Sequence, residues 1–211
     1  MSFDLKLHAY RLLMDEPFFA ALSRKIEKRA STAIPTAGVR VCPDTAQFEM
    51  IYNPDFFDSL PEEQVKGVLK HEFYHLIFEH VTSRRPEGVN HKVWNICADL
   101  AINSHLVGEL PDNCCMPGVG PFEGLPKGES AEWYLANFPE RPEGEGEGEG
   151  EGEPGEGSGE GSGEGESFDD HSGWSEDGDS PAQEAANQMA KERLKQGMKE
   201  AAKEASQSPK G

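Results

Sequence analysis

Hydrophobic positions along the first part of the chain recur at two different spacings, which predict a mixture of helices and strands. Over residues 3–29 the apolar side chains recur at about helical spacing, with a break near Pro17. Residues 38–42 and 48–52 are short β-branched and aromatic segments separated by turn residues, which predicts two strands of a hairpin. We therefore expect an α+β fold with a small antiparallel sheet.

A long helix is predicted over residues 61–81, after the hairpin. Ser59 and Glu62 have the spacing of a capping box, in which each side chain bonds the backbone of the other residue. Four apolar residues fall on one side of the predicted helix and indicate the face that packs into the core. They are Val65, Leu69, Phe73 and Leu76.

Two further helices are predicted in the remainder of this region. The first covers residues 91–107, with Asn90 placed to cap its start and Gly108 just beyond its end. The second is a short helix over residues 131–137. Together with the hairpin, these elements predict one α+β domain over residues 1–139.

The composition changes sharply after this domain. From residue 143 to residue 180 there are fifteen acidic residues and no Lys or Arg, so this stretch carries −15 of the formal net charge of −19. Residues 140–167, almost entirely Glu and Gly, cannot bury enough apolar surface to fold and predict a disordered linker. Because the charge belongs to a linker and is negative, nucleic-acid binding is excluded. Residues 168–211 form a tail, with a helix predicted over residues 181–206 that either docks or stays mobile.

Cysteine usage and hydropathy indicate the compartment. The four cysteines form no Cys-x-x-Cys pair, and the chain shows no leader pattern and no apolar run of about 18 residues. We therefore expect a cytoplasmic protein with reduced thiols and no contact with a membrane.

The sequence His71-Glu-Phe-Tyr-His75 lies in the middle of the long predicted helix. Residues four apart share a helix face, so His71 and His75 can bind one zinc ion. Glu72 lies ~100° around the helix, beside the metal, where a carboxylate can take a proton from a zinc-bound water. This pattern predicts a zincin-type metallopeptidase in which Glu72 is the general base.

A catalytic zinc site needs a third protein ligand, which must come from outside this pentapeptide. Glu79 lies ~12 Å from His71 along the helix axis, too far to share the ion, so it is expected to contact a ligand side chain rather than the metal. His80 falls within the apolar stripe and is interpreted as a hydrogen-bonded core histidine. Thermolysin-like enzymes place a Glu and an Asp where this chain has Asn95 and Asp99.

Asp99 is the expected third ligand, because an amide is a poor zinc ligand. The alternative is that Asp99 does not touch the metal and instead hydrogen-bonds and orients one of the ligating histidines. Asn95 and Asn103 share its helix face and are candidates to hydrogen-bond a ligand side chain or to pack between the helices.

Taken together, the segments around His71–His80, Trp94–Asn103 and Ser130–Tyr134 resemble the predicted VWA-associated metallopeptidases of bacteria and phages. The triplet Asp169-Asp170-His171 is similar to a later element of that family. The resemblance implies a zincin fold and a metal site. Related proteins often continue into a von Willebrand A-like domain, whereas this sequence stops at Gly211, so a role that depends on that domain is not expected.

Two functional hypotheses follow. The first is a zinc-dependent enzyme that hydrolyses peptide or protein substrates, with residues 48–52 as an edge strand that pairs with extended substrate. The second is a metal-binding but non-proteolytic interaction or assembly module, which contacts a partner protein through the acidic tail.

Asp169, Asp170 and His171 are candidate lid residues. They follow a Gly-rich segment whose end-to-end distance is ~25–30 Å if it is flexible, enough to cross one face of the domain. The hypothesis is that they fold back over the zinc site.

Overall fold

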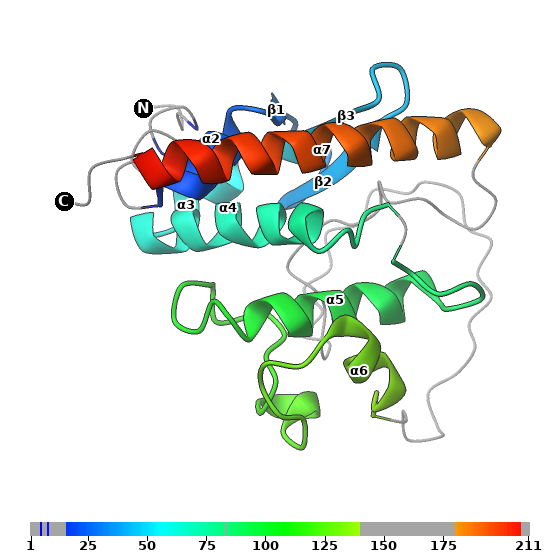
Figure 1. The fold of residues 1–211 in the computed structure, drawn as a ribbon. Coiled ribbons are helices and arrows are strands. Elements are labelled where there is room, and N and C mark those ends of the chain that lie inside the picture. Colours follow the sequence, from blue (N-terminus) through cyan, green and yellow to red (C-terminus); the bar gives the residue numbers. More distant parts are fainter. Residues whose placement is uncertain (1–4, 6–7, 9–15, 83, 140–179, 208–211) are drawn as a thin grey trace.

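The structure, a computed structural model, describes residues 5, 8, 16–82, 84–139 and 180–207. In Figure 1 the sheet and the long helix α7 form one layer, α4 lies beneath them, and α5 and α6 lie on the far side of α4. The described elements are α2 (Pro17–Ser23), β1 (Glu27–Ala30), β2 (Ala37–Cys42), β3 (Gln47–Tyr52), α3 (Pro54–Ser59), α4 (Glu62–Ile77), α5 (His91–Asn103), η1 (Gly120–Phe122), α6 (Ala131–Ala136) and α7 (Pro181–Gln207).

The sheet has three strands in the order β1-β3-β2. The predicted hairpin is confirmed: β2 pairs antiparallel with β3, and Val39 lies opposite Met50. However, β1 pairs with the other side of β3 in parallel, and Arg29 lies opposite Ile51. The sheet is therefore mixed rather than antiparallel. The prediction that residues 48–52 form an edge strand is wrong, because β3 is central and paired on both sides.

Strand β1 replaces the end of the helix that apolar spacing predicted up to residue 29. Its residues are largely exposed, so they carry no hydrophobic alternation that would indicate a strand. The strand forms because β3 offers an unpaired edge, and tertiary pairing outweighs local propensity. Lys28 supports the change of direction, since its ammonium group donates to the carbonyls of Ser23 and Ile26. Burial lowers the pKa of Lys28 to about 8.

The predicted capping box at the start of α4 is also wrong. Ser59 is the last residue of a separate short helix, α3, and its hydroxyl donates to the carbonyl of Phe56 at 2.6 Å. Asn53 caps α3 by accepting from the backbone N–H of Asp55 at 3.0 Å. Helix α4 then begins after Pro61, which makes no side-chain cap bond. The side-chain cap is therefore Asn53 at the start of α3, rather than Ser59 at the start of α4.

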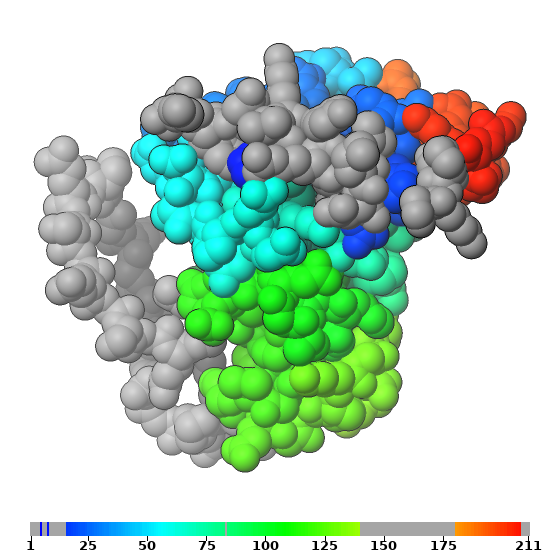
Figure 2. Space-filling view, turned by 90° about the vertical axis from the view of Figure 1, so that its left-hand side faces the viewer, coloured from blue at the N-terminus to red at the C-terminus, as the bar shows by residue number. Residues whose placement is uncertain are grey.

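The apolar face predicted for α4 is confirmed. Its four residues are no more than 1% exposed and belong to one core that also includes residues of α2, the sheet and α5. Trp94 of α5 and Tyr134 of α6 are wholly buried in the same core. As Figure 2 shows, the segment from α5 to α6, in green, packs directly beneath the cyan residues of α3 and the start of α4.

Helix α7 docks on the fold formed by the preceding elements. It packs against α2 and against strands β2 and β3. Small residues such as Ala190 and Ala201 are wholly buried, which lets the helix approach closely despite its few large apolar side chains. Arg193 donates to the carbonyls of Thr45 and Ala46 at 2.8 and 2.9 Å. The sequence left open whether this helix docks or stays mobile. In the structure it docks, and it contributes to the same core.

Some predictions fall on residues that the structure does not describe. The Glu/Gly segment at residues 140–167 and the candidate lid residues Asp169, Asp170 and His171 lie outside the described residues. Within the described residues, no helix combines the length and the apolar character that crossing a membrane requires.

Candidate metal centre

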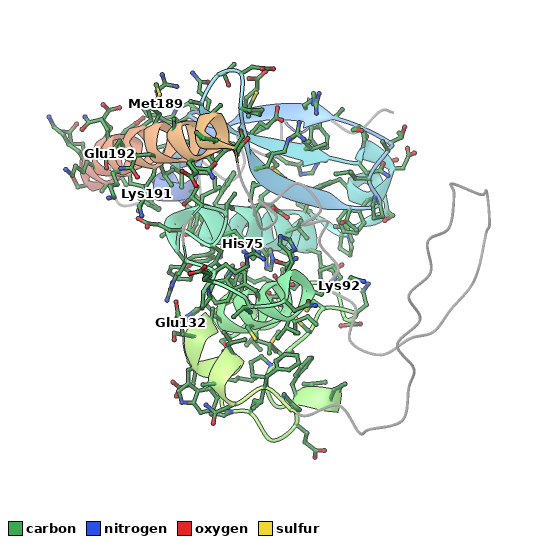
Figure 3. All side chains as sticks on the ribbon, turned by 90° about the vertical axis from the view of Figure 1, so that its right-hand side faces the viewer. His75, Lys92, Glu132, Met189, Lys191 and Glu192 are labelled. Carbon is green, nitrogen blue, oxygen red and sulfur yellow. The ribbon has the colours of Figure 1, made fainter. Side chains whose placement is uncertain are left out.

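Helices α4 and α5 bring three candidate ligands together. The Nε2 atoms of His71 and His75 lie 2.8 Å apart, and Asp99 Oδ1 lies 3.2 Å from His75 Nε2 and 3.6 Å from His71 Nε2. All three side chains are wholly buried. Figure 3 shows His75 reaching from α4 toward α5. Among the described residues, these three form the one group of at least three His, Cys, Asp or Glu side chains that could hold a metal ion.

The spacing of these atoms fits a zinc ion. Tetrahedral zinc with bonds of ~2.0–2.1 Å holds its ligand atoms ~3.3 Å from one another. The three separations, 2.8, 3.2 and 3.6 Å, lie on either side of that value. Two imidazoles and one carboxylate are also a donor set that zinc prefers. The residues present therefore fit the metal that the sequence pattern implies.

Asn103 determines how His71 is oriented. Its amide nitrogen donates to the backbone carbonyl of Cys115 at 2.7 Å, which turns the amide oxygen toward His71. That oxygen lies 2.8 Å from His71 Nδ1 and can only accept, so Nδ1 carries the hydrogen. The lone pair of His71 is then on Nε2, which faces His75 and Asp99. Asn103, one of the residues expected beside the ligands, thus lies in hydrogen-bond contact with His71.

His80 makes the corresponding contact with His75. The two Nδ1 atoms lie 3.2 Å apart, and His80 is only 2% exposed, in agreement with its interpretation as a hydrogen-bonded core histidine. The sequence did not predict that His80 contacts His75, a candidate ligand. Helical spacing places His80 on another side of the helix from His75, but α4 ends at Ile77 and the chain then turns back.

Glu79 and Asn95 make polar contacts with residues other than the three candidate ligands. The Glu79 carboxylate lies 2.5 Å from the ammonium group of Lys191 on α7. The Asn95 amide nitrogen lies 3.1 Å from His91 Nδ1, one turn before it on α5. Glu72, the predicted general base, follows His71 on α4 and is wholly buried.

Two groups close to the candidate ligands have shifted pKa values. Burial and the negative charge of Asp99 raise the pKa of Cys97 to about 12, so this thiol stays protonated near the site. Burial alone would lower the pKa of Lys70. Its hydrogen bonds and charge interactions with Glu109 and Glu16 outweigh burial and raise that pKa. Lys70, which is adjacent to His71, therefore stays charged and fixes α4 against the chain segments before α2 and after α5.

A fold with two histidines and one carboxylate gathered on two packed helices is typical of metal-dependent hydrolases. A family model described as "Putative metallopeptidase domain" matches residues 2–211, and the chain belongs to this family. The chain is also similar to an uncharacterized protein of Thermotoga maritima, with 27% identity over 62 residues. That match covers 29% of this chain and only 16% of the Thermotoga protein. No solved structure matches the chain significantly.

Proposed function

We propose that the protein is a zinc-dependent metallopeptidase that hydrolyses peptide bonds. The observation that carries this proposal is the convergence of His71, His75 and Asp99 from two helices at separations that suit one zinc ion. The family to which the chain belongs supports a hydrolase of this class. The VWA-associated branch of such enzymes is the one that its sequence motifs favour.

Each residue of the site has a part in the proposed reaction. His71, His75 and Asp99 would hold the zinc ion through Nε2, Nε2 and Oδ1, and Asn103 would keep the His71 ring in the required tautomer. Bound zinc lowers the pKa of water toward ~7 and polarises the peptide carbonyl. Glu72 would accept the proton of the attacking water and then donate it to the departing amine.

Burial favours a second candidate, in which the metal stabilises a protein that binds a partner and does not hydrolyse peptides. Glu72 and the three candidate ligands are all wholly buried, whereas a peptidase must admit a substrate to its metal. In this case the acidic segment at residues 143–180 would be the contact for a basic partner protein.

Substitution of Glu72 tests the proposed function. Wild-type protein purified without chelator should contain about one zinc per chain and should hydrolyse an unstructured protein such as casein. Glu72→Gln should keep the zinc and lower the rate ~10²–10⁴-fold, because an amide cannot accept the proton. Glu63→Gln, an exposed substitution in the first turn of α4, is the matched control and should leave the rate unchanged.

The two candidate functions give different results in this experiment. Zinc content is measured by atomic absorption. About one zinc per chain, with no hydrolysis by either wild type or Glu72→Gln, would favour the binding module. Equal hydrolysis by wild type and Glu72→Gln would contradict the role of Glu72.

A further inference from the structure

The C-terminal end of α4 has an unusual turn. Glu79 has a positive φ of 60°, a conformation that glycine usually occupies after a helix. The Glu79 N–H donates to the carbonyl of Leu76 at 3.0 Å, and the His80 N–H donates to the carbonyl of His75 at 3.0 Å. These two bonds form a Schellman motif, which reverses the chain and ends the helix.

This turn brings His80 back over His75. The His80 backbone N–H bonds the His75 carbonyl, and the two rings lie with their centroids 5.4 Å apart. The His80 ring also packs against Phe78 and against Trp94, with centroid separations of 5.7 and 5.9 Å. Its position is therefore set both by the turn and by α5.

The metal would decide which of the two rings, His75 or His80, donates the hydrogen bond between them. His75 Nε2 faces His71 and Asp99, so a metal bound there leaves Nδ1 of His75 to carry the hydrogen. His80 Nδ1 lies 3.2 Å away, and it would accept that hydrogen in the tautomer that carries its own hydrogen on Nε2. A hydrogen bond of this kind fixes the ring orientation of a ligating histidine and raises its basicity.

Glu79 connects the turn to a distant part of the chain. Its carboxylate is paired with Lys191 of α7, and both side chains are mostly buried, at 33% and 21% exposure. In Figure 3 Lys191 lies on the side of α7 that faces α4, whereas Met189 lies on the outer side. A residue other than glycine resists a positive φ, so a partner for its side chain helps to hold this conformation.

We propose that His80 is a positioning residue for His75, and that Lys191 of α7 holds the turn carrying His80 through its ion pair with Glu79. The proposal rests on the proposed function only in taking His75 as a metal ligand. Residues 180–207 would then support the metal centre, although none of them belongs to the candidate ligand group.

Zinc release from the intact chain tests this proposal. Lys191→Met should release zinc to an excess of chelator ~2–30-fold faster than wild type, as followed with a metal-sensitive dye. Lys195→Met is the matched control: it lies one turn further along α7 and pairs with Glu192 of the same helix at 3.7 Å. Equal release rates in the two variants would overturn the role of Lys191.

A second substitution tests whether Lys191→Met acts through the turn at Glu79 or through a general loss of stability. Glycine adopts a positive φ without the help of an ion pair. The double variant Glu79→Gly/Lys191→Met should therefore return zinc release to near the wild-type rate. Release as fast as in Lys191→Met alone would show that Lys191 does not act through the turn.

The role of His80 is tested in the same assay. His80→Leu should weaken zinc binding ~10–100-fold, and His80→Asn, which retains an acceptor close to the position of Nδ1, should recover most of the affinity. In the cobalt-substituted protein, His80→Leu should shift the visible absorption bands, whereas His80→Asn should not. Identical affinities and spectra for the two variants would overturn the positioning role.

These results are distinguishable from a failure of the proposed function. A wild type that binds zinc but hydrolyses nothing would remove the peptidase activity and leave the release assay intact. A wild type that binds neither zinc nor cobalt would overturn both. A wild type that is active, with unchanged zinc release in every variant, would overturn the present inference alone.

Discussion

Asn103 joins His71 to the backbone of Cys115, so one side chain controls the tautomer of a candidate ligand. Asn103→Leu removes both hydrogen bonds and should lower zinc affinity ~10–100-fold. Competition with a chelator of known affinity measures the change. Asn95→Leu, two turns earlier on α5 with its amide at His91, should bind zinc as wild type does. An equal loss in both variants would contradict a specific role for Asn103.

Asp99 is either the third ligand or a residue that only orients a histidine, and one isosteric substitution separates the two roles. Asp99→Asn keeps the shape of the side chain but replaces the carboxylate with an amide, which binds zinc poorly. As a ligand, Asp99 should then matter more than Asn103, and zinc affinity should fall by more than ~100-fold. Zinc content after dialysis reports the outcome. Full occupancy in Asp99→Asn would exclude Asp99 from the ligand set.

Much of this site could be predicted from the sequence because helical spacing is a local property. The four-residue spacing of His71 and His75 requires only that their segment be helical. Asp99 required a comparison with known enzymes, since no local rule places α5 against α4. The contact of His80 with His75 could not be predicted, because it depends on a chain reversal at Glu79, a residue type that does not signal a positive φ.

Gly67 makes α4 fit against the loop that follows α5. A Cβ atom at this position would lie 1.9 Å from the carbonyl oxygen of Glu109, so backbone would have to move. Although alanine favours an isolated helix by ~1 kcal/mol over glycine, Gly67→Ala should lower the free energy of unfolding by ~1–3 kcal/mol. Urea denaturation followed by circular dichroism measures this change.

Gly197 of α7 provides the control for this prediction. A Cβ atom there would meet only the Lys25 side chain, at 3.5 Å, which is ordinary contact. Gly197→Ala should therefore be neutral or stabilising by up to ~1 kcal/mol. Equal stabilisation by both substitutions would show that the loop after α5 yields easily at Gly67.

The helices and strands differ in how far they could be predicted. Strands β2 and β3 and helices α5 and α6 carry regular apolar spacing or a capping side chain, and these elements were predicted within a few residues. Strand β1 is short and charged, so only its pairing with β3 makes it a strand. Helix α7 formed where expected, but its docking depends on small buried residues such as Ala190, which sequence patterns do not distinguish from surface alanines.

At the scale of the whole molecule, the ion pair of Arg84 with Glu132 links the segment after α4 to α6. Its contribution to the free energy of unfolding depends on pH. Arg84 donates to both Glu132 oxygens, at 2.5 and 2.8 Å. Burial raises the pKa of Glu132, but its hydrogen bonds, led by that from Arg84, outweigh this effect and place the pKa below the ordinary 4.5. The ion pair therefore stabilises the fold above pH 4.5, and this stabilisation is lost as pH falls through the lower, folded-state pKa.

Arg84→Met should thus lower the free energy of unfolding at pH 7, by less than ~1 kcal/mol because the pair is partly exposed. The difference from wild type should shrink as the pH falls below 4.5, and denaturation curves at several pH values would show it. In a Glu132→Gln background, the same substitution should have an effect that does not vary over this range. A constant difference between wild type and Arg84→Met would contradict the assignment.

The docking of α7 on α2, β2 and β3 has a consequence for how the chain behaves when it is cut. Residues 140–179 join two parts of one core, so they keep α7 at a high effective concentration beside its docking surface. A single protease cut within them would turn an intramolecular contact into a bimolecular one. The stability of the cut protein would then rise with protein concentration, whereas that of the intact chain would not.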